Sequence, residues 1–228
     1  MTNSPEFVLY AYNFPSRAER VIWVLNELGL DYDLIRLNPL EGETLAPEFL
    51  KMNPARKVPV LLHEGRIYTE SVAILVYLCS LHPEANLLPA GRDGGDLGPG
   101  SLTEADVEGE GNYRVWHAIS YGLSEVEPYL WIADQCTRLK MLYHWPKSTL
   151  EESLDRVKTA IQHLYAIVEE NEFVAGKQFS IADIYIHHIL GWSRGYQFKP
   201  PAPALAYMKR LAQRPGYPSS LKKPQEDV

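Results

Sequence analysis

The sequence contains only two cysteines, no cluster of basic residues and no long uninterrupted apolar run. Cys79 and Cys136 lie within helical patterns and lack metal-ligand spacing, so we expect no metal and two free thiols in a reducing compartment. Neither an apolar N-terminal signal region nor a segment long enough to cross a bilayer occurs, which favours a cytoplasmic location.

The charge balance is acidic. Asp and Glu number 29 against 22 Lys and Arg, for a net charge of -7. Because nucleic acids and anionic membranes attract basic surfaces, we expect neither as a partner. The 228 residues, 46% of them hydrophobic, are enough for one large domain or two modest ones.

The pattern of apolar residues changes near residue 90. Before it, short apolar runs alternate with amphipathic segments, which predicts a β-α-β unit followed by β-β-α. The expected strands are 7–12, 32–37, 58–62 and 66–68, and the expected helices are 16–29, 47–51 and 70–82. The Gly- and Pro-rich stretch "PAGRDGGDLGPGS" at 89–101 indicates a linker.

The part after the linker is expected to be all helical. One buried helical stripe is formed by Leu150, Leu154, Val157, Ile161, Leu164 and Val168. We therefore expect domains at 1–84 and 104–228, joined by a linker at 85–103.

Pro59 interrupts an otherwise strand-like run and removes a ladder hydrogen bond there. In thioredoxin-like domains, which share this β-α-β-β-β-α order, a cis proline opens the third strand. It exposes the backbone of the preceding residue, here Val58, to a peptide-like ligand. Taken alone, the dipeptide favours an ordinary trans proline at a strand edge or turn.

Two motifs identify a family. "NPARKVPVLLHEGRIYTESVAILVYL", 53–78, resembles the glutathione-binding segment of cytosolic glutathione transferases, and "FVAGKQFSIADI", 173–184, is similar to their C-terminal capping-box and staple motif. In the second motif Ser180 caps a buried helix, Asp183 reaches back and Phe179 packs at the helix start. The likeness is to bacterial or fungal theta- or nu-like members.

The resemblance implies a GST fold, with an α/β thioredoxin-like N-terminal domain (βαβαββα) and an all-α C-terminal domain. It implies glutathione as cosubstrate, without a metal, and a two-fold homodimer with Arg66, Tyr77 or Leu81 near the interface. The second substrate would be a small hydrophobic electrophile. The alternative is a non-catalytic member that uses the groove for binding or regulation.

The ligand roles follow from the first motif. Glu70 would bind the glutathione ammonium, and Ser71, at a helix N-terminus, the γ-glutamyl carboxylate. Val58, before Pro59, would pair with the cysteinyl backbone, and Lys57 is placed for the glycyl carboxylate. Helix capping is the alternative role of Glu70 and Ser71, and a solvated side chain that of Lys57.

One stretch departs from the family pattern. Where many relatives carry His or Gln for the glycyl carboxylate, "EGETLAPEF" offers Glu43 and Thr44. The Thr44 hydroxyl replaces part of that contact, whereas a second negative charge does not. A polar capping loop fits equally well, so weaker glutathione affinity or another thiol ligand stays open.

The donor to the glutathione thiolate has three candidates. Aligning "PSR", 15–17, with theta-like members places Asn13 at the catalytic position, with Tyr12 and then Ser16 as rivals. An amide donates a hydrogen bond to a thiolate but cannot act as an acid. The pattern Ser16–Glu19 is itself a capping box, which would occupy Ser16.

Aromatic residues at helical spacing mark a candidate second-substrate pocket between the domains. They are Tyr113, Trp116, His117 and Tyr121, accompanied by Ser120 and, after the capping-box helix, Trp192 and Tyr196. Such a stripe is more often core than pocket. The sequence leaves open whether the reaction is conjugation, peroxide reduction or disulfide reduction.

Overall fold

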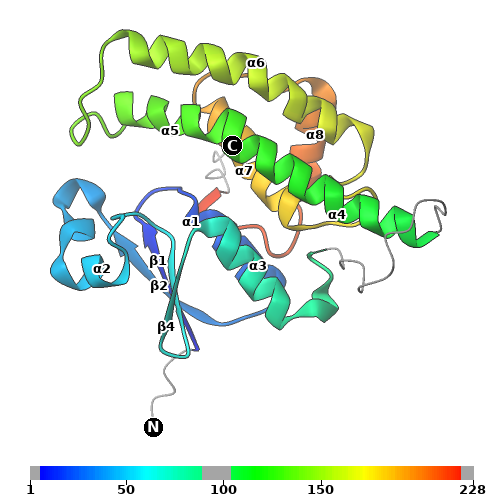
Figure 1. Ribbon diagram of the computed structural model, residues 1–228, viewed down its shortest axis with the longest axis horizontal. Coiled ribbons are helices and arrows are strands. Elements are labelled where there is room, and N and C mark those ends of the chain that lie inside the picture. The colour runs from blue at the N-terminus through cyan, green and yellow to red at the C-terminus, as the bar shows by residue number, and fades with distance from the viewer. Residues whose placement is uncertain (1–5, 89–103, 222–228) are drawn as a thin grey trace, which may run out of the picture. The chain divides into compact units, whose positions relative to one another are not determined.

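The structure is a computed structural model that describes residues 6–88 and 104–221 (Figure 1). It contains two compact units. Unit 1 comprises the described residues of Met1–His82 and Ala212–Val228, and unit 2 those of Pro83–Leu211. The expected boundaries at 84, 103 and 104 stay a prediction, because most of the linker lies outside the described residues.

Unit 1 is built on a four-stranded sheet with the order β2-β1-β3-β4. The strands are β1 Phe7–Tyr12, β2 Tyr32–Leu37, β3 Val60–His63 and β4 Arg66–Thr69. The first two run parallel, and β3 is antiparallel to both β1 and β4. This is the predicted topology, except that β3 begins after Pro59, which has no N–H to offer the ladder.

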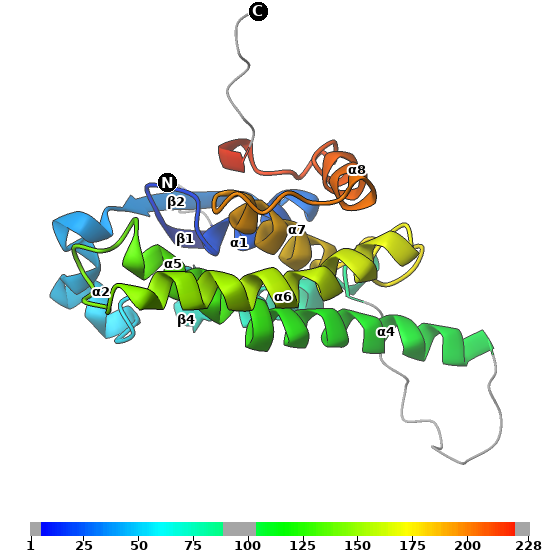
Figure 2. The ribbon, with the colours of Figure 1, turned by 90° about the horizontal axis from the view of Figure 1, so that it is seen from above.

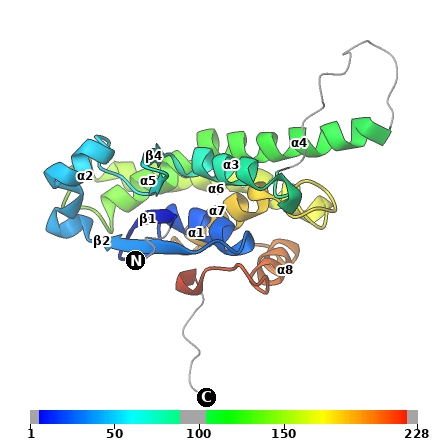
Figure 3. The ribbon, with the colours of Figure 1, turned by 90° about the horizontal axis from the view of Figure 1, so that it is seen from below.

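Three helices belong to the sheet: α1 Ala18–Glu27, α2 Pro47–Met52 and α3 Ser71–Leu81. Figure 3 shows α1 and α3 side by side, and the two helices pack on each other. In α1 every residue from Ala18 to Leu25 is buried. The predicted thioredoxin-like α/β arrangement is confirmed.

The segment after Ala212 returns to α1. Arg214 binds Glu27 through two hydrogen bonds, Nε to Oε1 at 2.9 Å and Nη2 to Oε2 at 2.8 Å. The Asn26 amide donates to the Gly216 carbonyl at 3.1 Å, and the Trp23 and Tyr217 rings meet edge to face with centroids 4.8 Å apart. A Cβ at Gly216 would lie 2.6 Å from Glu27 Cγ, so the close approach requires glycine.

Unit 2 is helical, as predicted (Figure 2). Its helices are α4 Glu104–Tyr121, α5 Glu127–Cys136, α6 Ser148–Glu170, α7 Ile181–Arg194 and α8 Ala202–Leu211. A π-helical turn, Gly122–Val126, separates α4 from α5. Of the predicted α6 stripe, Val157, Ile161, Leu164 and Val168 are buried, and Leu150 and Leu154 are half-buried. None of the helices in the described residues is long and apolar enough to span a membrane.

The start of α7 confirms the second motif. The Asp183 carboxylate accepts the Ser180 backbone N–H at 2.8 Å, the Val174 N–H at 2.9 Å and the Tyr207 hydroxyl at 2.7 Å. Phe179 is buried and packs edge to face on Phe173. Because a buried carboxylate is costly unless it is hydrogen-bonded, these donors are what keep Asp183 in the core.

Candidate active site

Most of the predicted site residues of unit 1 lie at one end of its strands, which we call the glutathione edge of the sheet. Val60 pairs with Tyr10 on one side and with Thr69 on the other. The residues just before Val60 therefore share an edge with those just after Tyr10 and Thr69. That edge holds Val58–Pro59, Tyr12–Asn13 and Glu70. The Val58–Pro59 bond is cis, the form that the thioredoxin-like order implies and that the dipeptide taken alone does not.

Glu70 occupies an unusual backbone position at the start of α3. Its φ of 66° and ψ of 110° lie in a region that residues other than glycine seldom adopt. The side chain is exposed, and its carboxylate makes no hydrogen bond or ion pair with any residue that the structure describes. Backbone strain of this kind, of order 1–3 kcal/mol, collects at functional sites.

Ser71, the first residue of α3, is buried beside Glu70. The first helical hydrogen bond runs from the Ile74 N–H to the Glu70 carbonyl at 2.9 Å, so the three preceding N–H groups, 71 to 73, have no helical acceptor. Free N–H groups and the positive end of the helix dipole both favour an anion. This end of α3 can therefore receive a carboxylate.

Arg20 of α1 lies behind Ser71. It is buried, and its Nη1 donates to the Ser71 hydroxyl oxygen at 3.1 Å. Because Ser71 accepts this bond, its own hydroxyl proton is left to donate to another group. Arg20 was not among the predicted site residues, although a charged residue one turn before Val24, within the buried stretch of α1, is a signal in the sequence.

Asn13 follows β1 directly and is exposed. Its backbone N–H donates to the Leu37 carbonyl at 2.9 Å, whereas its side-chain amide bonds to none of the described residues. Tyr12 is buried in a cluster with Phe49, Val58 and Val60. Of the two, Asn13 is the side chain free to meet a ligand at this edge, while Tyr12 is largely engaged in packing.

The capping box predicted at Ser16 is wrong. Helix α1 begins at Ala18, with Arg17 as its N-cap residue. The Ser16 hydroxyl accepts the Ala18 N–H at 3.3 Å. Glu19 instead accepts a bond from Arg36 Nη1 at 3.1 Å and another from the Ser220 hydroxyl. The long-range arginine outcompetes the local cap because it brings a full charge to a buried carboxylate.

Lys57 and Thr44 lie in the two loops near the edge. Lys57 is exposed, and its carbonyl accepts the Asn53 amide at 2.8 Å. The Asn53 side-chain oxygen also accepts the Ala55 N–H at 3.0 Å. This asparagine, which is not among the predicted site residues, therefore shapes the loop before Val58. Thr44 is buried, at 5% exposure, within the 3-10 turn Glu43–Leu45.

Unit 2 carries the predicted aromatic residues of α4. The Tyr113 and His117 rings stack at 5.6 Å, and His163 of α6 joins them, 5.4 Å from His117 and 4.4 Å from Tyr121. The Tyr121 hydroxyl donates to the Ala160 carbonyl at 3.1 Å, and burial, with a smaller effect of Glu125, raises the Tyr121 pKa. Trp116 is 38% exposed. The helical spacing of the α4 aromatic residues could not predict His163, because His163 lies on another helix.

Comparison with known proteins decides the family. The glutathione S-transferase N-terminal domain model matches residues 7–80, and the C-terminal domain model matches residues 129–215. Glutathione S-transferase Z1 of Arabidopsis thaliana is 30% identical over 239 residues, covering 100% of this chain and 98% of the relative. The chain belongs to the glutathione transferase family.

Other glutathione transferases match parts of the chain or its fold. A zeta-class enzyme of Euphorbia esula is 44% identical over 88 residues, and the match spans only 39% of either protein. The transferase URE2P6 of Phanerochaete chrysosporium, solved in complex with oxidised glutathione, superposes with a TM-score of 0.74 at 24% identity, covering 95% of each chain. The theta- or nu-like placement stays a prediction.

Proposed function

We propose that this glutathione transferase binds glutathione at the sheet edge and activates its thiol for attack on a small hydrophobic electrophile. The observation that carries the proposal is Glu70, whose carboxylate bonds to none of the described residues and whose backbone is strained, beside the N-terminus of α3. A cap alone does not require such a backbone, because Ser, Asp and Asn cap helices from ordinary extended conformations.

Each part of glutathione has a partner at this edge. Glu70 binds the γ-glutamyl ammonium, and the Ser71 hydroxyl and N–H bind the neighbouring carboxylate, with the Arg20 charge behind them. Val58 pairs with the cysteinyl backbone, Pro59 fixes the start of the third strand, and Lys57 faces the glycyl carboxylate. Thr44 adds a hydroxyl contact, although its burial limits that role.

Asn13 holds the thiolate. Its side-chain N–H donates to the sulfur, which lowers the thiol pKa by favouring the anion. The thiol proton leaves to solvent, the sulfur lone pair forms a bond to the electrophilic atom, and the leaving group departs with its electron pair. Tyr12 is the second candidate, and Ser16 is the third because its oxygen already accepts the Ala18 N–H.

The second substrate and the partner follow from the family. Tyr113, Trp116, His117 and Tyr121 offer the aromatic surface that an apolar electrophile needs. The protein acts as a homodimer, with Arg66, Tyr77 and Leu81 near the interface. Arg66 and Leu81 are exposed, which suits that role. The cytoplasm, where glutathione is reduced, is its place of action.

The proposal is tested by an activity panel with glutathione against an aryl halide, cumene hydroperoxide and a glutathionyl disulfide. Conjugation of the aryl halide, lost in Glu70→Ala, is the expected result. Reduction of the peroxide or disulfide without conjugation would make the protein a peroxidase or reductase. Glutathione binding without turnover of any of the three would favour the non-catalytic alternative, for which the lack of a hydroxyl at Asn13 is the supporting observation.

A further inference from the structure

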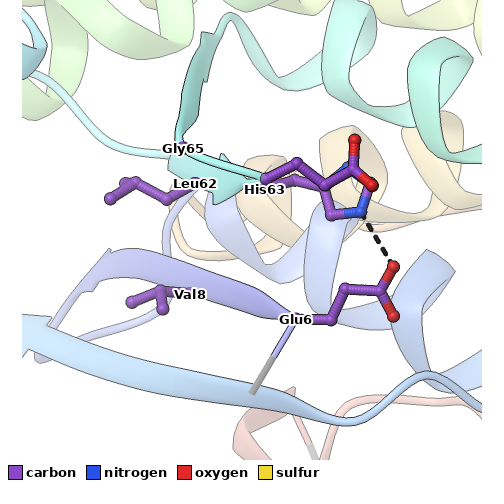
Figure 4. Close-up of a pocket in the computed structure, with 6 residues that line it drawn as sticks. Glu6, Val8, Leu62, His63 and Gly65 are labelled. Carbon is purple, nitrogen blue, oxygen red and sulfur yellow. Dashed lines mark hydrogen bonds and ion pairs between the residues drawn. The ribbon is translucent and has the colours of Figure 1, made fainter. Parts of the chain in front are cut away.

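A hollow lies at the end of the unit 1 sheet opposite the glutathione edge (Figure 4). It is lined by Glu6, Val8, Leu62, His63, Glu64 and Gly65. The register places it there, because Phe7 pairs with His63 at one end of the strands and Tyr10 with Val60 at the other. The proposed function uses none of these residues.

Three metal-ligating side chains cluster at this end of the sheet, where Glu6 and His63 point away from the apolar Val8 and Leu62 (Figure 4). Glu6, His63 and Glu64 each offer one ligand atom, and these atoms all lie within 4.8 Å of one another. The His63 Nε2 is 3.0 Å from Glu6 Oε1, as the dashed line in Figure 4 marks. Both glutamates are exposed, so an ion has access from solvent.

The imidazole of His63 is held in a fixed orientation. The side chain is only 5% exposed, and its ring stacks on Phe7 with centroids 4.2 Å apart. Its Nδ1 is hydrogen-bonded to the Tyr77 hydroxyl at 2.7 Å, and the Tyr77 ring in turn stacks on Tyr68 at 4.0 Å. Metal-binding histidines usually donate their second ring N–H to a partner that holds the ring. With an ion on Nε2, the Nδ1–H of His63 would donate to the Tyr77 hydroxyl oxygen.

The position of Glu64 is set by the hairpin between β3 and β4. Glu64 and Gly65 both have positive φ, 48° and 71°, as the two central residues of a type I′ turn do. Gly65 takes this conformation at no steric cost, and the tight turn keeps Glu64 next to His63. The turn thus fixes the backbone position of Glu64, and packing on Phe7 fixes the ring of His63.

We propose that Glu6, His63 and Glu64 form a binding site for a divalent transition-metal ion such as Zn²⁺, with water completing the coordination. One imidazole and two carboxylates are ligands that suit this class of ion. Donors at ordinary zinc distances in a tetrahedron are about 3.3 Å apart, so the Glu6–His63 pair needs to open by only a few tenths of an ångström.

The charges of the cluster suit a cation. A divalent ion would interact with both carboxylates, whereas the hydrogen bond to His63 engages only Glu6. Residue spacing could not reveal this set, because Glu6 and His63 are 57 positions apart. A bound ion would join the start of β1 to the β3–β4 hairpin and so stabilise the folded protein against heat.

The test uses the chelator-treated full-length protein without glutathione, at neutral pH and with a thiol-free reductant. Zn²⁺ is titrated by calorimetry, and thermal melting is followed with and without the ion. We expect one site and a rise in melting temperature in the wild type. Glu6→Gln and Glu64→Gln, which change exposed side chains, should each weaken zinc binding tenfold or more and remove the rise.

His163→Gln is the matched control, because His163 is another histidine beside an aromatic partner, 5.4 Å from His117. It should leave zinc binding unchanged. Absence of zinc binding in the wild type would overturn the proposal. Equal zinc affinity in the wild type and in a variant that carries both Glu6→Gln and Glu64→Gln would also overturn it. So would a loss of zinc affinity in His163→Gln as large as in Glu64→Gln, since either result places the ion elsewhere.

Discussion

Arg20 of α1 and Ser71 of α3, 51 positions apart in the chain, are joined by a buried hydrogen bond of 3.1 Å. The bond fixes the Ser71 side chain at the first turn of α3 and brings a positive charge beneath it. It therefore couples the packing of two helices to the end of the sheet where the proposed ligand carboxylate would lie.

Removing the Ser71 hydroxyl should weaken both folding and binding. Ser71→Ala takes the acceptor from a buried guanidinium donor, which should lower the free energy of unfolding by about 1–3 kcal/mol. It also removes one ligand contact. Ser80→Ala, on the exposed face of the same helix, is the control and should change neither. Urea unfolding and glutathione calorimetry on both variants measure the effects.

Asn13 should act on the thiol and not on affinity. One neutral donor contributes roughly 0.5–1.5 kcal/mol, so Asn13→Ala should raise the pKa of bound glutathione by about one unit or less and cut the aryl-halide rate at neutral pH several-fold. Thiolate absorbance in the ultraviolet, titrated with glutathione bound, gives the pKa. Equal pKa values in the two proteins would move the role to Tyr12, which Tyr12→Phe would then test.

The π-helical turn in unit 2 depends on a glycine. A Cβ at Gly122 would lie 2.4 Å from Cε1 of Tyr185, whose hydroxyl donates to the buried Glu127 at 2.8 Å. Gly122→Ala should therefore lower the free energy of unfolding by about 1–3 kcal/mol. Gly191→Ala, in α7, meets no atom within 4 Å and should be neutral or slightly stabilising. Similar melting temperatures for the two variants would contradict this packing.

His187 should make stability depend on pH. Burial lowers its pKa from 6.5 to about 4. Between pH 6.5 and pH 4, His187 is therefore protonated in the unfolded chain and neutral in the folded chain. This contribution to stability is fully present above pH 6.5 and is lost as the pH falls to about 4, a loss of ~3 kcal/mol. Urea unfolding from pH 7 to pH 4 should show a shallower decline in His187→Leu than in the wild type.

Local patterns predicted the fold well. Strands 7–12 and 32–37 have the predicted bounds, because short runs rich in aromatic and branched apolar residues favour strands. The Ser180–Asp183 capping box was predictable because its contacts span only three positions.

Most of the features that the sequence did not predict are contacts between distant residues. Arg20 reaches Ser71 across 51 positions, and the Arg214 guanidinium reaches Glu27 across 187. Ser16 and Glu19 have the spacing of a capping box, yet Glu19 pairs with Arg36. No periodicity encodes such partners, because they are chosen by the packing of whole elements.

Calorimetric titration of glutathione into the wild type and into Glu70→Ala tests the central claim most directly. A charge-assisted hydrogen bond contributes about 1.5–3 kcal/mol, so the folded variant should bind glutathione roughly 10- to 150-fold more weakly. Its unfolding free energy should fall little, because the exposed carboxylate bonds to no described residue. Wild-type affinity in a folded Glu70→Ala protein would contradict the assignment of this sheet edge as the glutathione site.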